Sequence, residues 1–174
     1  LTRPRPGHAD LPGMLSYDLS DARPVLERAS ARETAARVAL GALAEALLDQ
    51  VAGIRLVSHV VAVGAQRASA STIPTPADEE ALCAASMRTL DLADNARFEA
   101  AVDEAKHSGD TIGGVVEVIA YDVPVGLGTH VSARERLDAR LAGALMSIQS
   151  VKGVEIGDGF AQAALLGSAA HDEI

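Results

Sequence analysis

Three segments with helical spacing of apolar residues are each followed by a run rich in β-branched residues, and this alternation constrains the fold more than any other feature. The helices are expected at residues 31–51, 95–107 and 134–149, and the strands after them at 54–63, 113–128 and 151–156. Such alternation usually indicates a parallel α/β sheet. The crossovers lack a nucleotide-binding fingerprint at a strand-to-helix turn, so the pattern alone leaves α/β and α+β both open.

The first of these helices has the most clearly marked start. Ser30 followed three residues later by Glu33 is a capping-box pattern, and Gly53 suits the end of the helix. We therefore expect the helix to begin at Ser30, with Arg28 outside it. Such a start leaves backbone N–H groups beside Arg28 and Arg32, which favours an anion site. An ordinary capped helix with solvent-facing arginines explains the same residues equally well.

The remaining segments are expected to form a loop and a shorter helix. Residues 1–24 hold four of the seven prolines and two glycines, which predicts an ordered loop rather than a helix or a central strand. A helix at about 77–87 follows Thr75, its expected cap. Asp94 is expected to cap the helix that begins at residue 95.

Composition limits the class of protein and the kind of core. With 174 residues the chain is long enough for one globular unit, residues 1–174, and two Phe, two Tyr and no Trp predict a core of small aliphatic side chains. The single cysteine, Cys83, excludes a disulfide within the chain, favours a cytoplasmic protein and is expected in the core. The longest apolar runs are too short to cross a membrane.

The charge is acidic overall but basic near the beginning of the sequence. A net charge of −9 argues against a nucleic-acid surface, for which a basic balance is typical. Residues 1–37 carry six arginines against five acidic residues, and residues 38–174 carry nine basic residues against nineteen acidic ones. Chance scatter of surface arginines and a local anion site in an acidic protein explain this gathering equally well.

Residues 3–10 contain the first group of side chains suited to chemistry. Prolines and a glycine fix the backbone there while Arg3, Arg5 and His8 project from it, an arrangement suited to holding a phosphate or carboxylate beside a titratable acid. By itself a turn with surface charges is the simpler interpretation. The other histidines have no metal-ligand spacing with a carboxylate, and we expect them to be structural or solvated: His59, His107, His130 and His171.

Four motifs, weak one by one, resemble the chorismate synthase family when they are taken together in this order. They are Arg-Pro-Gly-His-Ala-Asp at 5–10, Arg-Ala-Ser-Ala-Arg-Glu-Thr at 28–34, Gly-Asp-Thr-Ile-Gly-Gly at 109–114 and Lys-Gly-Val-Glu-Ile-Gly-Asp-Gly-Phe at 152–160. The resemblance covers essentially the whole chain. It replaces the simpler interpretations of residues 3–10 and 27–34 as surface features.

The resemblance implies a fold, a reaction and a cofactor. The family fold is α+β, a layer of helices between two largely antiparallel four-stranded sheets, in a cytoplasmic homotetramer. The family reaction is an anti-1,4-elimination of phosphate from 5-enolpyruvylshikimate-3-phosphate, which gives chorismate for aromatic amino-acid biosynthesis through the shikimate pathway. It requires reduced FMN, with NADPH as an indirect reductant, and it implies no nucleic acid, membrane or metal.

The resemblance also assigns roles to residues, one position at a time. It makes His8 the catalytic residue that supplies a proton to reduced FMN. The residues that resemble the flavin-contacting positions are Arg28, Ala29, Ser30, Gln149 and Ser150. Those that resemble the substrate-binding positions are Arg5, Ala31 and Arg32.

Other motifs of the family are not among these residues. They are the Gly-Glu-Ser-His-Gly segment with a second catalytic histidine, the Lys-Pro flavin loop and the Arg-Ser-Asp motif with an acidic catalytic residue. We therefore expect a middle portion of a chorismate synthase that belongs to a longer enzyme. The alternative is a catalytically inactive structural fragment that keeps only part of the flavin and substrate site.

Overall fold

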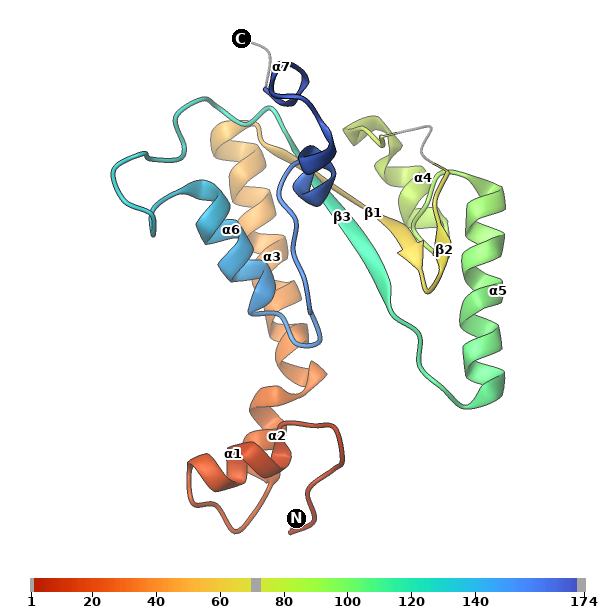
Figure 1. Cartoon of the computed structure of the whole chain (residues 1–174), viewed down its shortest axis with the longest axis vertical. Helices are drawn as coiled ribbons and strands as arrows, with labels where there is room; N and C mark the ends of the chain where they lie inside the picture. Colours follow the sequence, from red (N-terminus) through yellow and green to blue (C-terminus); the bar gives the residue numbers. More distant parts are fainter. Residues whose placement is uncertain (1, 70–72, 172–174) are drawn as a thin grey trace. The chain divides into compact units, whose positions relative to one another are not determined.

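The computed structural model describes residues 2–69 and 73–171, in which helices are combined with one small sheet (Figure 1). In chain order the elements are α1 (Asp10–Ser16), α2 (Arg23–Ala29), α3 (Ala31–Ala52), β1 (Arg55–Val63), β2 (Gln66–Arg67), the 3₁₀ turn η1 (Pro76–Asp78), α4 (Glu79–Ala84), α5 (Leu92–Ser108), β3 (Gly114–Tyr121), α6 (Leu137–Met146), the 3₁₀ turn η2 (Gly159–Ala164) and α7 (Gly167–Ala170).

The chain separates into two compact units. One contains the residues up to Ala42 together with those from Val125 onward, and the other is Leu43–Pro124. The first unit holds α1, α2, α6 and the beginning of α3, whereas the second holds the sheet, α4 and α5. That the whole chain forms a single domain, as its length predicts, stays a prediction.

The strands form an antiparallel sheet in the order β2-β1-β3. β1 pairs along its length with β3, from Arg55 opposite Tyr121 to Val63 opposite Gly114, with a register irregularity just before Ala62. Because both pairings are antiparallel, the α+β class is confirmed and the parallel α/β alternative is wrong. The two four-stranded sheets of the family fold stay a prediction.

The core of the Leu43–Pro124 unit is small and mostly aliphatic. Its largest fully buried apolar side chains are Phe98 of α5, Leu82 of α4 and Val57 of β1, and α5 contacts both β1 and β2. Burying a side chain of this size contributes about 1.5–3 kcal/mol. One ring among aliphatic side chains agrees with the prediction from composition.

The prolines of residues 1–24 predicted a loop, and this prediction was wrong for much of the segment. α1 occupies Asp10–Ser16, and α2 begins at Arg23. Pro12 lies in the first turn of α1, and Pro24 lies in the first turn of α2. The first-turn N–H groups of a helix have no acceptor within it, so a proline there removes no helical hydrogen bond. These prolines mark helix starts rather than a loop.

The helix α5 confirms one expected boundary and corrects the other. Asp91, not Asp94, is its N-cap, since the Asp91 carboxylate accepts the N–H groups of Ala93 at 2.7 Å and Asp94 at 3.1 Å. Gly109 follows the helix in the left-handed conformation with φ of 71°, as its position predicted. Asp94 lies inside the first turn, where its buried side chain turns to other donors.

The segment after β3 is less regular than predicted. α6 begins at Leu137 and ends at Met146, so it is shorter than the expected helix at 134–149. Residues 151–156 form neither strand nor helix, and the prediction of a strand there was wrong. A strand needs a partner for its backbone hydrogen bonds, and the described residues of this unit supply none.

The short helix before α5 also differs from its prediction. The expected helix at 77–87 is η1 followed by α4, which ends at Ala84, although Thr75 and Asp78 form the capping interaction at its start. Cys83 is exposed rather than in the core, and Leu82 is the buried residue of this helix. Within the described ranges, no helix combines the length and apolar character needed to cross a bilayer.

Candidate functional site

The junction of α2 and α3 places several of the predicted site residues. α2 ends at Ala29, Ser30 is extended with φ of −87° and ψ of 157°, and α3 begins at the next residue. The Ser30 Oγ accepts the N–H of Arg32 at 3.4 Å, which is a cap at the second helical position. The predicted start of the helix at Ser30 is therefore confirmed. Arg28 lies outside α3, but in the last turn of α2, a helix that the sequence pattern did not predict.

The hydrogen bond that Glu33 was expected to make to the backbone of Ser30 is replaced by bonds from side chains further away in the sequence. The side chain of Glu33 does not return to Ser30; it accepts hydrogen bonds from Gln149 Nε2 and from Arg37 Nε, the latter at 3.3 Å. These two donors, Gln149 first and Arg37 second, lower the pKa of the Glu33 carboxyl below its ordinary value. Glu33 is thus held as an anion in the first turn of α3, where the helix dipole also favours a negative charge.

Gln149, more than a hundred positions later in the sequence, makes hydrogen bonds to this junction. Its Nε2 donates to the backbone carbonyl of Arg28 at 3.3 Å and to Glu33. Its Oε1 accepts the Thr34 hydroxyl at 3.3 Å. Two groups of residues assigned to the flavin by resemblance, 28–30 and 149–150, are therefore in direct contact.

Two neighbours strengthen this connection. The Arg37 Nη1 donates to the hydroxyl of Ser147 at 2.7 Å, which ties α3 to the end of α6. Ser150 has a φ of 72°, a left-handed conformation that a residue other than glycine adopts only at a cost of roughly 1–3 kcal/mol. Asp18, Arg88 and Asp122 share this conformation without an assigned role, so it adds only that the backbone of Ser150, one of the residues assigned to the flavin, is held in place by its surroundings.

Residues 5–10 form a loop that is closed by a clamp between its ends. The buried carboxylate of Asp10 accepts Arg5 Nε at 2.8 Å, Arg5 Nη2 at 2.9 Å and the Arg5 backbone N–H at 3.0 Å. The side-chain bonds from Arg5 hold the pKa of the Asp10 carboxyl well below its usual range, and they raise the pKa of the guanidinium. Both groups are therefore charged at neutral pH.

His8 projects from the middle of this loop and is exposed. Its Nδ1 lies 2.9 Å from the backbone carbonyl oxygen of Pro6. A carbonyl oxygen can only accept, so Nδ1 carries the proton of this bond and Nε2 remains as the nitrogen that exchanges a proton. The imidazole is thus held in one tautomer.

The two arginines assigned to the substrate each bind a carboxylate of the chain. Arg5 binds Asp10, and Arg32 donates to Glu27 in an exposed ion pair. Within the described residues no hydrogen bond or ion pair links the loop 5–10 to the junction at Arg32, so the convergence of the two arginines on one cleft stays a prediction. The side chain of Ala31, also assigned to the substrate, lies outside the described residues.

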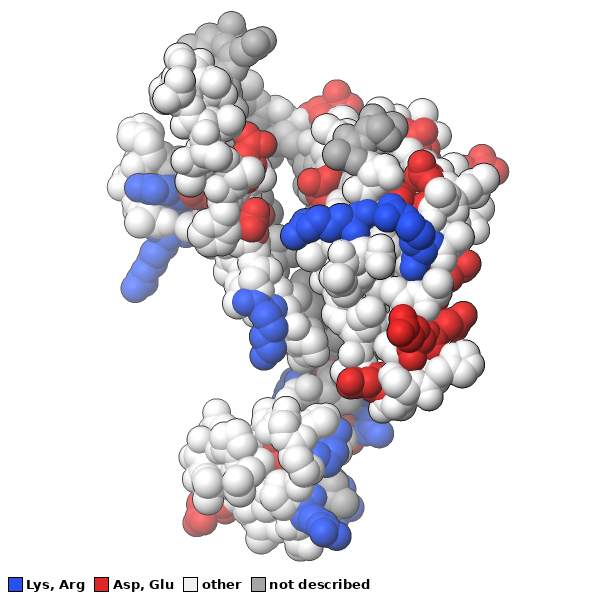
Figure 2. Space-filling model, turned by 45° about the vertical axis from the view of Figure 1, so that its right-hand side comes forward, with Lys and Arg blue, Asp and Glu red and all other residues white. Residues whose placement is uncertain are grey.

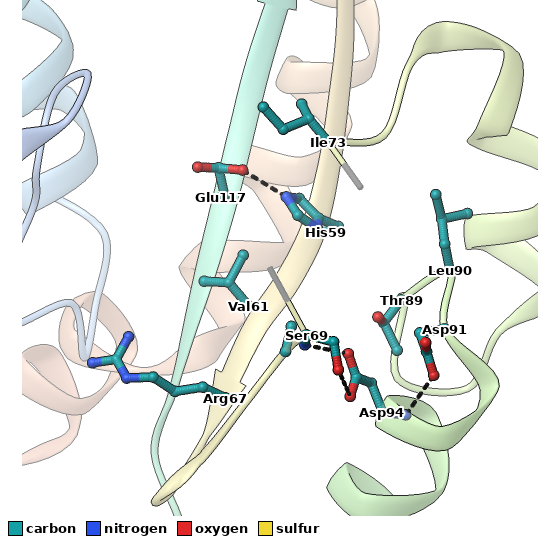
Figure 3. A pocket seen from close by; sticks show the side chains of 11 residues that line it. His59, Val61, Arg67, Ser69, Ile73, Thr89, Leu90, Asp91, Asp94 and Glu117 are labelled. Atoms are coloured by element: carbon teal, nitrogen blue, oxygen red, sulfur yellow. Dashed lines mark hydrogen bonds and ion pairs between the residues drawn. The ribbon is translucent and has the colours of Figure 1, made fainter. Parts of the chain in front are cut away.

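A second candidate is a cavity of about 480 Å³ in the Leu43–Pro124 unit. Figure 3 shows His59 and Glu117 pointing toward each other from adjacent strands, with His59 Nε2 2.6 Å from the carboxylate. Asp94 accepts the Ser69 N–H at 2.6 Å and the Ser69 hydroxyl at 3.1 Å. The lining contains none of the site residues predicted from the sequence, and these polar groups bind one another, as structural residues do.

The remaining charged groups fit an acidic protein. On the face shown in Figure 2, basic and acidic side chains are interspersed, and no continuous basic surface of the kind that binds nucleic acid covers that face. Among residues 2–69 and 73–171 no three histidine, cysteine or acidic side chains come close enough together to hold a metal ion.

Sequence reasoning missed the residues that hold the predicted site in place. Asp10 carried a weak local signal, because an acid five residues after an arginine in a proline-rich segment can close a loop. Glu33 was assigned to the capping box, and Thr34 had no assignment. Nothing in the local sequence pairs Gln149 with them, and the cross-strand pair of His59 with Glu117 follows only from the strand register.

Comparison with known proteins extends this picture along the whole sequence. The family model for chorismate synthase matches residues 1–174. The chorismate synthase of Acidothermus cellulolyticus is 64% identical over 174 residues, which cover all of this chain and 44% of that protein. Those of Streptomyces avermitilis and Bifidobacterium longum are 62% and 59% identical over 174 and 175 residues, with the same coverage. The chain thus spans less than half the length of these curated relatives.

A solved structure described as "Crystal Structure of Chorismate Synthase" has a similar fold. Its TM-score is 0.85 at 43% sequence identity, and the match covers 95% of this chain and 52% of that one. The sequence match along the whole chain and the structural match point to the same family. The motifs, the fold and these comparisons establish that the chain belongs to the chorismate synthase family.

Proposed function

We propose that this chain supplies part of the active site of a chorismate synthase, which eliminates phosphate from 5-enolpyruvylshikimate-3-phosphate to give chorismate in the shikimate pathway. One observation carries the proposal beyond family membership. Gln149 bonds the Arg28 carbonyl and Glu33, so two segments assigned to one cofactor meet at the capped start of α3.

The groups around this junction fit the binding of reduced FMN. The first-turn N–H groups of α3 and the guanidinium of Arg28 suit a negatively charged group, and the strained backbone at Ser150 lies next to the clasp formed by Gln149. The chemistry that reduced FMN would supply there is the transient donation of electron density to the substrate and its recovery. Arg28, Ala29, Ser30, Gln149 and Ser150 are the residues that would hold it.

His8 is the proposed catalytic residue of this chain. Its Nδ1–H is bound to the Pro6 carbonyl, which leaves Nε2 to give or accept a proton. The clamped loop holds the imidazole outward, so Nε2 is accessible to a bound group.

Arg5 and Arg32 are the proposed binders of the substrate anions. Nε and Nη2 of Arg5 are engaged by Asp10, and Nη1 remains on the other side of the guanidinium. Arg32 pairs with Glu27 in an exposed ion pair, which is worth only about 0–1 kcal/mol and can be exchanged for a phosphate or carboxylate of the substrate. Once released from Glu27, the fork of Arg32 can give bidentate bonds that lysine cannot make, whereas Arg5 offers Nη1 from a guanidinium held by Asp10.

Family membership supports the rest of the proposal: a cytoplasmic homotetramer in which NADPH reduces the flavin indirectly. The decisive experiment is an anaerobic assay of the full-length protein that contains this chain, with reduced FMN and the substrate, in which chorismate and released phosphate are measured together. Equimolar formation of both is expected. Full-length protein that binds FMN but releases neither product overturns the proposed activity.

The inactive structural fragment is the alternative, because the chain spans only 44% of its relatives. The intact mass of the protein purified from its source separates the two. A mass near 17.9 kDa, that of these residues alone, supports the fragment. A mass more than twice as large supports the enzyme.

A further inference from the structure

We propose that Asp10 is a positioning residue that fixes the loop carrying His8 and orients Arg5 toward the substrate. The inference rests on the function proposed above and adds a residue to it. Asp10 touches no reacting group in this scheme; it acts through the two residues that do.

The contacts described for the Asp10 carboxylate come from one residue. Its side chain has no exposed surface, and the hydrogen bonds described for its carboxylate all come from Arg5. Oδ2 accepts the backbone N–H at 3.0 Å and Nε at 2.8 Å, and Oδ1 accepts Nη2 at 2.9 Å. One carboxylate therefore fixes both the backbone and the guanidinium of the same residue, and closes residues 5–10 into a ring.

The interior of this ring leaves His8 little freedom. Pro6 has its φ fixed by its own ring, and Gly7 has a φ of +71°, a conformation that favours glycine. A Cβ on Gly7 would meet nothing, so the glycine serves the turn and not the packing. With both ends clamped by Asp10 and the Nδ1 of His8 bound to Pro6, the direction of the imidazole follows from the position of the clamp.

If Asp10 served only to cap α1, its carboxylate would make a different set of hydrogen bonds. Asp10 is the first residue of α1, where an acidic side chain commonly accepts N–H groups of its own helix. Here the carboxylate turns away from α1 to Arg5, and Ala9 supplies no side-chain cap. The negative charge of Asp10 therefore stabilises the loop that precedes the helix and not the helix itself.

The orientation of Arg5 follows from the same bonds. A bidentate contact to a carboxylate fixes the plane of a guanidinium. Because Nε and Nη2 face Asp10, Nη1 is directed to the opposite side, where a substrate anion can accept from it. Asp10 thus makes Arg5 a rigid donor rather than a flexible surface charge.

The test compares three variants of the full-length protein: Asp10→Ala, Asp10→Asn and the matched control Asp21→Ala. Asp21 makes comparable bonds outside the loop 5–10, accepting the backbone N–H of Arg23 at 3.0 Å and its Nε at 2.8 Å, and neither residue is assigned to the site. The Asn variant keeps one acceptor oxygen and the shape of the side chain. It also stands in if the Ala variant does not fold.

Hydrogen exchange of the peptide that contains residues 5–10 is the first measurement. Loss of the Asp10 acceptor should accelerate its exchange about tenfold or more, because the Arg5 amide and the loop are released. Asp21→Ala should leave that peptide unchanged. A folded Asp10→Ala protein in which this peptide exchanges at the wild-type rate contradicts the clamp.

Kinetics separate positioning from mere support of the fold. Asp10→Ala should lower kcat by about a hundredfold through His8 and raise the substrate KM about tenfold through Arg5. The FMN Kd, measured by flavin fluorescence, should stay within about twofold. The kcat and KM of Asp10→Asn should lie between those of Asp10→Ala and the wild type, and those of Asp21→Ala should match the wild type. Adding Asp10→Ala to Arg5→Ala should leave KM at the value of Arg5→Ala alone.

The outcomes distinguish this inference from the function on which it rests. A wild-type protein that makes no chorismate overturns the proposed function and with it the catalytic meaning of the clamp. An active wild type whose Asp10 variants loosen the loop but keep kcat and KM overturns only the inference. A fall in kcat accompanied by equal losses of substrate affinity and FMN affinity also overturns it, since such a result indicates a general defect of the fold.

Discussion

At His8, the hydrogen bond to the Pro6 carbonyl fixes which ring nitrogen can transfer a proton. Replacing His8 with Ala should lower kcat of the full-length enzyme by about a hundredfold, the usual effect of losing a positioned proton donor, while KM changes much less. Steady-state kinetics with reduced FMN measure both constants. His107→Ala is the matched control, because that imidazole is also exposed with its Nδ1 on a backbone carbonyl, at 2.7 Å. Equal losses in kcat and in affinity would exclude the assigned role.

Arg32 tests whether the substrate site needs the planar fork of arginine. Arg32→Lys keeps the charge but cannot bind an anion bidentately, so we expect substrate affinity to fall about tenfold or more. FMN affinity should change little, because the residues assigned to the flavin are intact. Equilibrium binding of each ligand separates the two effects. Arg23→Lys, in an exposed pair with Asp21, is the control, and normal substrate binding by Arg32→Lys would remove Arg32 from the site.

At the scale of elements, Gln149 is the clasp between the α2–α3 junction and the segment after α6. Gln149→Ala removes its bonds to the Arg28 carbonyl, Glu33 and Thr34, each worth about 0.5–1.5 kcal/mol. We expect FMN affinity to fall by about tenfold, which corresponds to 1.4 kcal/mol, because the junction that these bonds order in advance must then be ordered when FMN binds. Flavin fluorescence titration measures the change.

The control for this clasp is another glutamine that holds a backbone carbonyl. Gln162 donates from Nε2 to the Ala170 carbonyl at 2.9 Å, a bond in which no residue assigned to the flavin or the substrate takes part. Gln162→Ala should leave FMN affinity unchanged. Unchanged affinity in Gln149→Ala as well would show that the contact supports the fold without shaping the flavin site.

The elements also show where local sequence patterns suffice. Ser30 and Gly109 were placed correctly because a cap and a left-handed glycine act within one helical turn. Asp94 was assigned to the cap that Asp91 makes, because two acids three residues apart satisfy the same local pattern. Which of them is buried depends on Ser69, a contact between distant segments.

At the scale of the molecule, the decisive information is long-range. Helix–strand alternation suggested a parallel sheet, yet β1 and β3 are antiparallel, and strand direction is set by pairing rather than by propensity. The assigned site was found through motifs, which identify residues but not their neighbours. The clasp of Gln149 and the burial of Asp10 appear only once the chain is folded.

The large apolar side chains on the second half of α3 also show that burial depends on long-range contacts. Leu43, Leu47 and Val51 recur at helical spacing, which helped to place this helix, yet they are 71%, 61% and 76% exposed. The spacing identified the helix correctly, whereas burial depends on what packs against it. Because the chain covers 52% of its structural relative, we expect the rest of the family domain to cover this face.

Stability against acid is a property of the whole molecule that rests on a few carboxylates. The pKa of Asp94 is lowered from 3.8, first by the side-chain bond from Arg97 and then by the backbone N–H of Ser69, and Arg5 lowers the pKa of Asp10. A carboxyl whose pKa is lower in the folded state stabilises the protein above its unfolded pKa. That contribution is lost as the pH falls below about 4 toward the folded pKa.

Asp94→Asn should therefore destabilise the full-length protein most at neutral pH. The buried carboxylate makes charge-assisted hydrogen bonds with Arg97 and Ser69, so we expect the free energy of unfolding to fall by about 2 kcal/mol at pH 7. The gap between wild type and variant should narrow as the pH is lowered toward 3, because the carboxyl of the unfolded wild-type chain then takes up a proton that the folded carboxylate resists. Urea denaturation at both pH values measures it. Asp103→Asn, on the exposed side of the same helix, should show no gap at either pH. A gap for Asp94→Asn that is the same at pH 7 and pH 3 would mean that the ionised carboxylate is not what stabilises the contact with Ser69.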